Sequence, residues 1–373
     1  MVKSEILKEN TSRDRLQLDF KRTVLALTII TSATLLYTMS RFDATTIVSS
    51  LLGSSASSVL QIALSLVLVL LFIIGMIFII GLIIGESLIS PPLFTPIDAI
   101  REFSTIKISI VFFLFTFACP ILITSVLTLF SFYSFVQTQK VILADLIDPI
   151  DPLLTLVSLI LIVTLLGPLQ EELIFRVFNG FWLEQTELRF TVKISIISGL
   201  FWMMHFMYPD DVRFVVPWMI EVLFGAYLFY FLYRAQGQTN PTYIILLPLI
   251  AHVLVNGLDV VLVLLELYFL DPLLVEIFAV ILALCFLISS GILYHHWHMQ
   301  GIFPSLSLTQ ALRQIGRSMV VFFVTILGFF AGVILIQEIF LIGLSMLLYL
   351  VFIVVLVTSV LLFRDKISFG RNM

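Results

Sequence analysis

The chain has 373 residues, of which 60% are hydrophobic and 12% are charged, and its formal net charge is −4. Soluble domains carry roughly 25% charged residues, so this composition excludes an ordinary soluble protein and indicates a polytopic membrane protein. The small net charge provides no basic face for nucleic acid, and no nucleic-acid partner is expected. The expected fold is all-α, a bundle of transmembrane helices whose surroundings are the lipid bilayer.

Apolar stretches along the chain predict about ten membrane spans. A helix needs roughly 20 apolar residues to cross a bilayer, and the run from Val59 to Gly85 is longer than that. The first predicted span, Val24 to Met39, is short. The fourth is expected to continue past Gly167 and Pro168, because a proline can kink a helix without ending it. The predicted spans are centred near Ile30, Phe72, Phe115, Leu161, Ser198, Leu223, Val253, Leu282, Leu327 and Val351.

The distribution of basic residues predicts the orientation of the chain. With the N-terminus in the cytoplasm, only Arg41, Lys140 and Arg213 of the 20 lysines and arginines lie outside. The positive-inside rule then places both termini in the cytoplasm. The expected organisation is a cytoplasmic N-terminal segment (1–23), a membrane-embedded helical core (24–295), a cytoplasmic connection (296–318), and two additional C-terminal spans with a short tail (319–373).

Charged residues gather unexpectedly in the stretch "GPLQEELIFRVFNGFW", residues 167–182. On a helix, Glu172 and Arg176 lie four residues apart and are expected to form an ion pair on one face. Glu171 points about 100° away, so its carboxylate is left free. Ionisable groups inside membrane spans are costly, and each is a candidate functional residue.

Two histidines and an asparagine within later spans complete this set. His205 stands alone in "FWMMHF", whereas His252 and Asn256 lie four residues apart and share one helix face. The chain is expected to turn near "EQTELRF". Glu171 and His205 then lie about 24 to 27 Å of helix from that turn, and therefore at similar depth. Four polar groups from three helices are thus expected to converge within the membrane.

A carboxylate near histidines and an asparagine is suited to hydrolysis. One carboxylate can take a proton from water, and neutral donors can hold a developing oxyanion. No serine, cysteine or threonine stands out as a nucleophile, so water is the simplest attacking group. Alternatively, Glu171, His205 and His252 could bind zinc, a divalent metal that leaves one position open for water. Taken singly, the ion pair and each buried histidine are also common structural contacts between helices.

Three short motifs resemble those of the CAAX protease and bacteriocin-processing family of intramembrane endopeptidases, which includes the Ras-converting CAAX prenyl proteases. They are "EELIFR" (171–176), "FWMMH" (201–205) and "HVLVN" (252–256), similar to the E-E-x-x-x-R, F-x-x-x-H and H-x-x-x-N motifs. The resemblance implies a core of eight helices. It also implies that Glu171 activates water with His205, and that His252 and Asn256 stabilise the oxyanion. Glu172, Arg176 and Phe201 would support them.

The function implied is an endopeptidase that cleaves membrane-bound peptides or lipidated proteins, including prenylated CAAX-type substrates. Metalloprotease and metal-independent glutamate mechanisms are both described for the family. The sequence does not decide between these two mechanisms, and it does not identify the substrate. A proton- or ion-coupled transporter that uses the intramembrane Glu and His residues is an alternative, as is a non-proteolytic scaffold or immunity protein. Glu86 and Glu221 have no role in this interpretation and are expected at the edges of spans.

Overall fold

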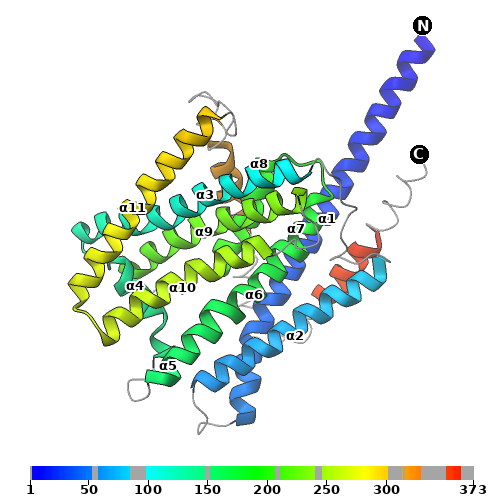
Figure 1. The fold of residues 1–373 in the computed structure, drawn as a ribbon. Helices are drawn as coiled ribbons and strands as arrows, with labels where there is room; N and C mark the ends of the chain where they lie inside the picture. The colour runs from blue at the N-terminus through cyan, green and yellow to red at the C-terminus, as the bar shows by residue number, and fades with distance from the viewer. Residues whose placement is uncertain are drawn as a thin grey trace.

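The computed structural model describes residues 2–52, 58–84, 98–147, 152–205, 211–239, 246–300, 313, 316–328 and 350–362. Throughout these ranges the chain is mainly helical and contains no strand (Figure 1). Glu86 lies outside them. The long helices are α1 (Val2–Leu52), α2 (Ser58–Ile84), α3 (Asp98–Leu127), α8 (Phe190–Met204), α9 (Val212–Thr239), α10 (Leu246–Tyr268) and α11 (Pro272–Met299).

Seven of the described helical segments are long and apolar enough to cross a membrane: Asp19–Leu52, Val59–Ile84, Ser109–Phe130, Leu153–Glu184, Val212–Tyr233, Leu246–Tyr268 and Pro272–Met299. The other three predicted spans correspond to shorter apolar helices, Phe190–Met204, Gly316–Gly328 and Leu350–Leu362. The predicted all-α, polytopic fold is therefore confirmed, and the protein is an integral membrane protein.

Helix α1 is much longer than the predicted first span of residues 24–39. Its sequence has no glycine or proline from Val2 to Leu52, and Gly53 follows directly. Because these residue types are the strongest helix breakers, the helix continues through the polar residues on both sides of the apolar stretch. Its N-terminal part extends beyond the other helices (Figure 1).

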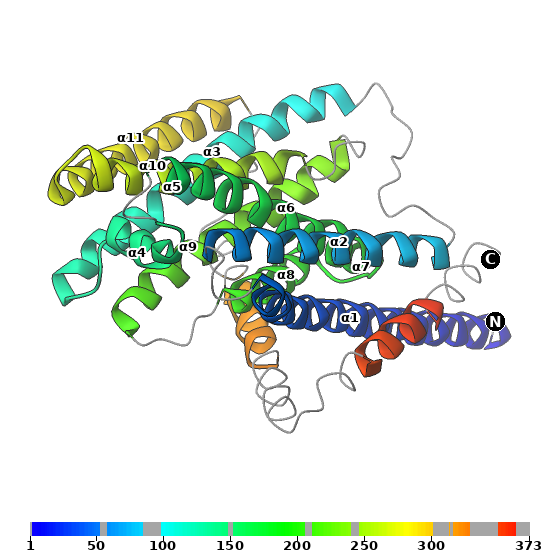
Figure 2. The same ribbon diagram turned by 90° about the horizontal axis from the view of Figure 1, so that it is seen from below.

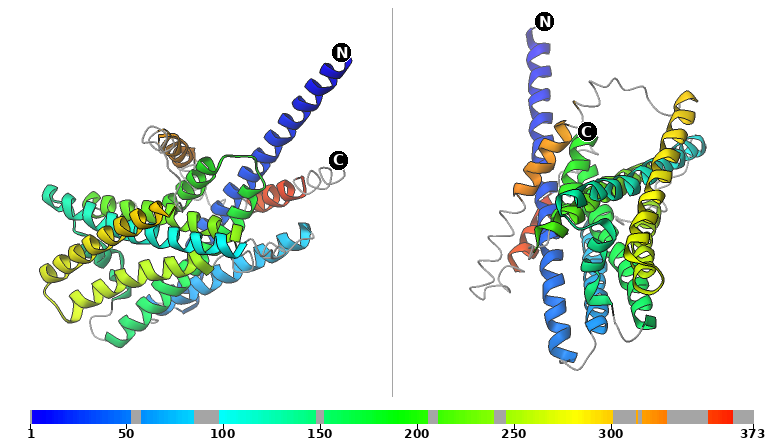
Figure 3. Two further views of the ribbon diagram at one scale, coloured as in Figure 1. Left: turned by 45° about the horizontal axis from the view of Figure 1, so that its top comes forward. Right: turned by 90° about the vertical axis from the view of Figure 1, so that its left-hand side faces the viewer.

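The helices pack as a layered bundle around α9. Helix α3 lies along both α9 and α11, while α8 and α10 contact α9 (Figures 1 and 2). On the other side, α1 packs against α2 and crosses the helix that ends in α7 (Asn179–Glu184) (Figure 3). Large apolar side chains such as Leu71, Phe78 and Ile288 are exposed on α2 and α11. Such surfaces are stable when they face lipid.

One continuous helical stretch, Pro152 to Glu184, positions the charged residues of the candidate site. It consists of α5 (Pro152–Ser158), η3 (Leu159–Leu166), α6 (Gly167–Glu171), η4 (Glu172–Phe178) and α7, of which η3 and η4 are π-helical. The stretch runs through Pro168, as expected from the sequence. Widened π-helical turns are rare and often occur at functional sites.

Candidate active site

Glu172 and Arg176 form the expected ion pair in the interior of the bundle. Arg176 Nη1 lies 3.2 Å from Glu172 Oε1, and both side chains are fully buried. Nitrogens of the Arg176 guanidinium form no further hydrogen bond with the described residues. Instead, the group lies over the ring of Phe201 at 4.3 Å and near that of Phe229 at 5.3 Å. Cation–π attraction thus replaces hydrogen bonds on this side of the guanidinium.

His252 connects the two adjacent glutamates. Its Nδ1 lies 2.9 Å from Glu172 Oε1, and its Nε2 lies 3.7 Å from Glu171 Oε2. The imidazole is buried and stacks on Phe229, with 4.1 Å between ring centroids. A carboxylate can only accept a hydrogen bond, so Glu172 favours the form of His252 that carries a proton on Nδ1. In the neutral ring, Nε2 then directs its lone pair toward Glu171.

His205, at the C-terminal end of α8, approaches Glu171 from another side. Its Nε2 lies 3.3 Å from Glu171 Oε1, and its Nδ1 lies 2.9 Å from the carbonyl oxygen of Phe201. Because a carbonyl accepts, Nδ1 donates and Nε2 is the free nitrogen of the neutral ring. Trp218 Nε1 donates to the carbonyl oxygen of His205 at 3.2 Å, which ties the end of α8 to α9.

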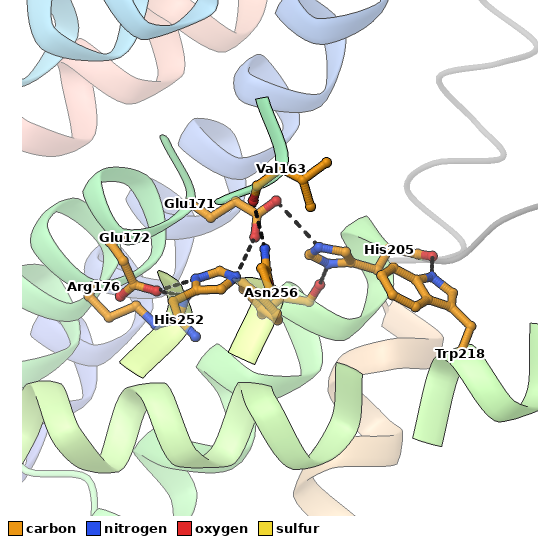
Figure 4. Close-up of polar contacts among 9 residues, drawn as sticks. Val163, Glu171, Glu172, Arg176, His205, Trp218, His252 and Asn256 are labelled. Carbon is orange, nitrogen blue, oxygen red and sulfur yellow. Dashed lines mark hydrogen bonds and ion pairs between the residues drawn. The ribbon is translucent and has the colours of Figure 1, made fainter. Parts of the chain in front are cut away.

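Asn256 is held by the irregular part of the helix before Glu171. In η3 the N–H of Gly167 bonds to Ile162, five residues back, and Pro168 has no N–H. The carbonyl of Val163 therefore lacks both of its ordinary backbone donors. Asn256 Nδ2 donates to this oxygen at 2.9 Å, which fixes the asparagine beside Glu171 (Figure 4). The second hydrogen of the amide nitrogen is not used by this bond.

Glu171 is the meeting point of these groups. Its carboxylate faces the Nε2 atoms of His205 and His252, and it is only 8% exposed. Both imidazoles are anchored through Nδ1, so their orientations are fixed by partners outside the contact with Glu171 (Figure 4). The predicted convergence of groups from three helices is present. The arrangement can bind and move a proton, and His205 and Asn256 are its partly exposed members, whereas Glu171 and His252 are buried.

The donor types of Glu171, His205 and His252 are those that zinc prefers. Across the described residues, however, no group of three or more His, Cys, Asp and Glu side chains is arranged so that it could hold a metal ion. The geometry therefore does not support these residues as a metal site.

The sequence did not reveal the contribution of helix α1. The ring of Tyr37 meets Phe175 edge-on at 6.1 Å, and Arg41 lies 5.8 Å above the ring of Tyr37. Arg41 and Tyr37 thus connect α1 to the helical stretch that carries Glu171. Thr38 Oγ1 also bonds to the sulfur of Met204, next to His205, at 2.8 Å. The residues on one face of α1 recur at helical spacing, but the long apolar sequence gave no sign of which helix they would contact.

The fold and the cluster define a class: a polytopic helical membrane protein with a Glu, His and Asn site buried among its spans. Residues 153–258 match the family model described as Type II CAAX prenyl endopeptidase Rce1-like. The chain thus carries an Rce1-like domain, and the resemblance seen in the three motifs is confirmed. This domain spans all of the site residues above except those of α1. No curated protein and no solved structure matches the chain.

Proposed function

We propose that this protein is an intramembrane endopeptidase that cleaves membrane-associated peptides or lipidated proteins, with prenylated CAAX-type tails as the first substrates to test. The observation that carries the proposal is the approach of His205 and His252 to Glu171, from three separate helical segments, within an Rce1-like domain. Such a set supports hydrolysis by a water molecule without a covalent intermediate.

Glu171 is the general base in this mechanism. A water molecule between Glu171 and the Nε2 atom of His205 gives a proton to the carboxylate, and its oxygen attacks the carbonyl carbon of the scissile bond. Glu171 then passes the proton to the departing amine as the C–N bond breaks. His205 orients the water, since its Nδ1 is already bound to the carbonyl of Phe201. Burial excludes bulk water and strengthens these interactions.

Asn256 and His252 stabilise the negative charge that develops on the substrate oxygen. The amide hydrogen of Asn256 that does not bind Val163 is one donor. The other is His252 Nε2 in the doubly protonated ring, whose additional proton is taken from solvent before the attack and stays on the ring through the reaction. Glu172 stabilises that positive charge through its contact with Nδ1, and Arg176 and Phe201 hold Glu172 and its surroundings in place. The two adjacent glutamates thus have different roles: Glu171 takes the proton from water, whereas Glu172 orients His252.

The experiment is cleavage of a farnesylated, CAAX-tailed peptide by the purified protein in lipid. Glu171→Gln is compared with Glu187→Gln, a matched change in the exposed turn between α7 and α8. We expect the wild type and Glu187→Gln to cleave and Glu171→Gln to be inactive but folded. Full activity of Glu171→Gln would overturn the mechanism. If no form cleaves this peptide, an unprenylated membrane-anchored peptide tests the substrate class, and proton flux in liposomes tests the transporter alternative.

Both termini are proposed to be cytoplasmic, on the strength of the basic residues in the predicted cytoplasmic segments. Labelling of single cysteines introduced near each end, in sealed vesicles, would test this orientation. Reagents that do not cross the membrane should modify both positions only when the cytoplasmic side is accessible.

A further inference from the structure

A second group of buried polar residues lies apart from Glu171. Glu221 of α9 was expected at the edge of a span, but it lies within Val212–Tyr233 and is buried. Its neighbour is Asp259 of α10, which is 4% exposed. Asp259 follows Asn256 by three residues, about 5 Å along the helix, and His252 by seven, about 10 Å, so the pair lies next to the catalytic cluster but includes none of its members.

The two carboxyl groups are hydrogen-bonded to each other. Gln139, on the short helix α4 (Phe135–Ile142), donates from Nε2 to Glu221 Oε2. The Oδ1 atom of Asp259 is buried and has no hydrogen-bond partner among the described residues. Three helices thus hold two acids in contact, and one carboxyl oxygen is left without a donor.

Among the side chains that the structure describes, no lysine or arginine forms an ion pair with either acid. The charged side chains described on the surrounding helices have other partners. Lys140 of α4 pairs with Glu266 of α10 at 2.8 Å, and Arg213 of α9 pairs with Asp211 at 2.6 Å. The remaining contacts join Glu276 of α11 to Ser134, Lys193 of α8 to Glu184, and Glu171 of α6 to His205.

Two ionised carboxylates cannot form a hydrogen bond, because each can only accept. Burying two like charges without a cation would also be very costly. One proton shared by the pair removes both problems, and the amide of Gln139 can then satisfy the remaining negative charge. We infer that Glu221 and Asp259 bind one proton between them, and so form an intramembrane proton-binding site beside the catalytic cluster. The proton belongs to the pair and not to either residue alone.

Infrared spectroscopy of the purified protein tests this inference directly, because a protonated carboxyl group has its own carbonyl band. The spectrum of the double variant Glu221→Gln/Asp259→Asn is subtracted from that of the wild type in neutral buffer. We expect the difference to contain the intensity of one protonated carboxyl group per molecule, and of two after acidification. Glu266→Gln is the control: its carboxylate pairs with Lys140, so this change should remove no such intensity at neutral pH.

Three results would overturn the inference. A neutral-pH difference of zero would mean that both acids are ionised, and a difference of two that both are protonated. A band that appears only after sodium, potassium and divalent cations are removed would identify a cation site instead. If the double variant is not folded, the single variants Glu221→Gln and Asp259→Asn replace it, and each must alter the same wild-type band. None of these outcomes depends on peptide cleavage, so the proposed protease function is tested separately.

Discussion

Glu172 Oε1 lies 2.9 Å from His252 Nδ1, and this contact joins the π-helical segment η4 to α10. The same glutamate oxygen is 3.2 Å from Arg176 Nη1. One buried carboxylate therefore has two duties: it neutralises the arginine, and it sets which nitrogen of His252 faces Glu171. These duties can be separated by mutation, because the first concerns stability and the second concerns the reaction.

Arg176→Met should destabilise the protein strongly. The change leaves Glu172 buried without its cation, and breaking a buried ion pair in this way costs about 3–5 kcal/mol. It also removes the positive charge from the ring of Phe201. The midpoint of thermal unfolding in detergent should fall by several degrees. An unchanged midpoint would show that Glu172 finds another partner or a proton without cost.

The double variant Glu172→Gln/Arg176→Met should recover most of this stability, because no unpaired charge remains. Its peptidase activity should nevertheless remain about tenfold or more below that of the wild type, since His252 has lost the anion that orients it. Thermal unfolding and turnover number are measured on the same preparation. A double variant as active as the wild type would remove Glu172 from the mechanism.

Asn256→Ala should lower kcat by roughly 10²–10³-fold with a smaller change in KM, because an oxyanion donor acts mainly in the transition state. The variant also loses the bond to Val163, so the thermal midpoint must be measured beside the kinetics. Asn256→Asp is the matched comparison: it keeps the size of the side chain but has no N–H donors. A change confined to KM in both variants would argue against the oxyanion role.

Peptidase activity should survive dialysis against a zinc chelator. The proposed steps use Glu171, His205, His252 and Asn256 and require no Lewis acid, so the rate should remain within about twofold of the untreated protein. The measurement is the initial rate before and after chelation, with metal content determined in parallel. A loss of activity that added zinc restores would show instead that these side chains bind a metal.

Arg41→Gln should lower turnover on the order of tenfold, equivalent to about 1.4 kcal/mol in the activation free energy. Arg41 lies outside the Rce1-like domain, yet Tyr37 connects it to Phe175, four residues from Glu171, and a nearby cation favours the negative charge that the proposed mechanism needs. Arg41→Lys should retain more activity than Arg41→Gln. The control is Arg213→Gln, because the side chain of Arg213 is about half exposed and pairs with Asp211. Equal rates for Arg41→Gln and the wild type would confine α1 to a packing role.

Several features of the site were predictable because they depend on local periodicity. The four-residue spacing of Glu172 and Arg176 placed them on one helix face, and their ion pair is present. The matched depths of Glu171 and His205 followed from the turn between α7 and α8, which the structure places between Glu184 and Phe190. The roles proposed for these residues remain predictions, since geometry alone does not measure turnover.

Other features depended on contacts between distant segments. Asn256 was predicted to face a substrate oxygen, but one of its hydrogens is bound to Val163, because a π-helical turn and Pro168 leave that carbonyl without a backbone donor. Glu221 was expected at a span edge, and only the packing of α4, α9 and α10 brought it to Asp259. Neither of these two contacts can be predicted from the local sequence.

The sequence by itself determined that this is a helical membrane protein, because apolar length and the cost of burying backbone polar groups in lipid leave few other folds. It also determined which charged residues would be exceptional, since each is expensive within a span. Only the tertiary structure decided which of them meet. In an apolar bundle almost every helix face can pack against almost any other, so the partners of Glu171, Arg41 and Asp259 are set by three-dimensional packing and not by local pattern.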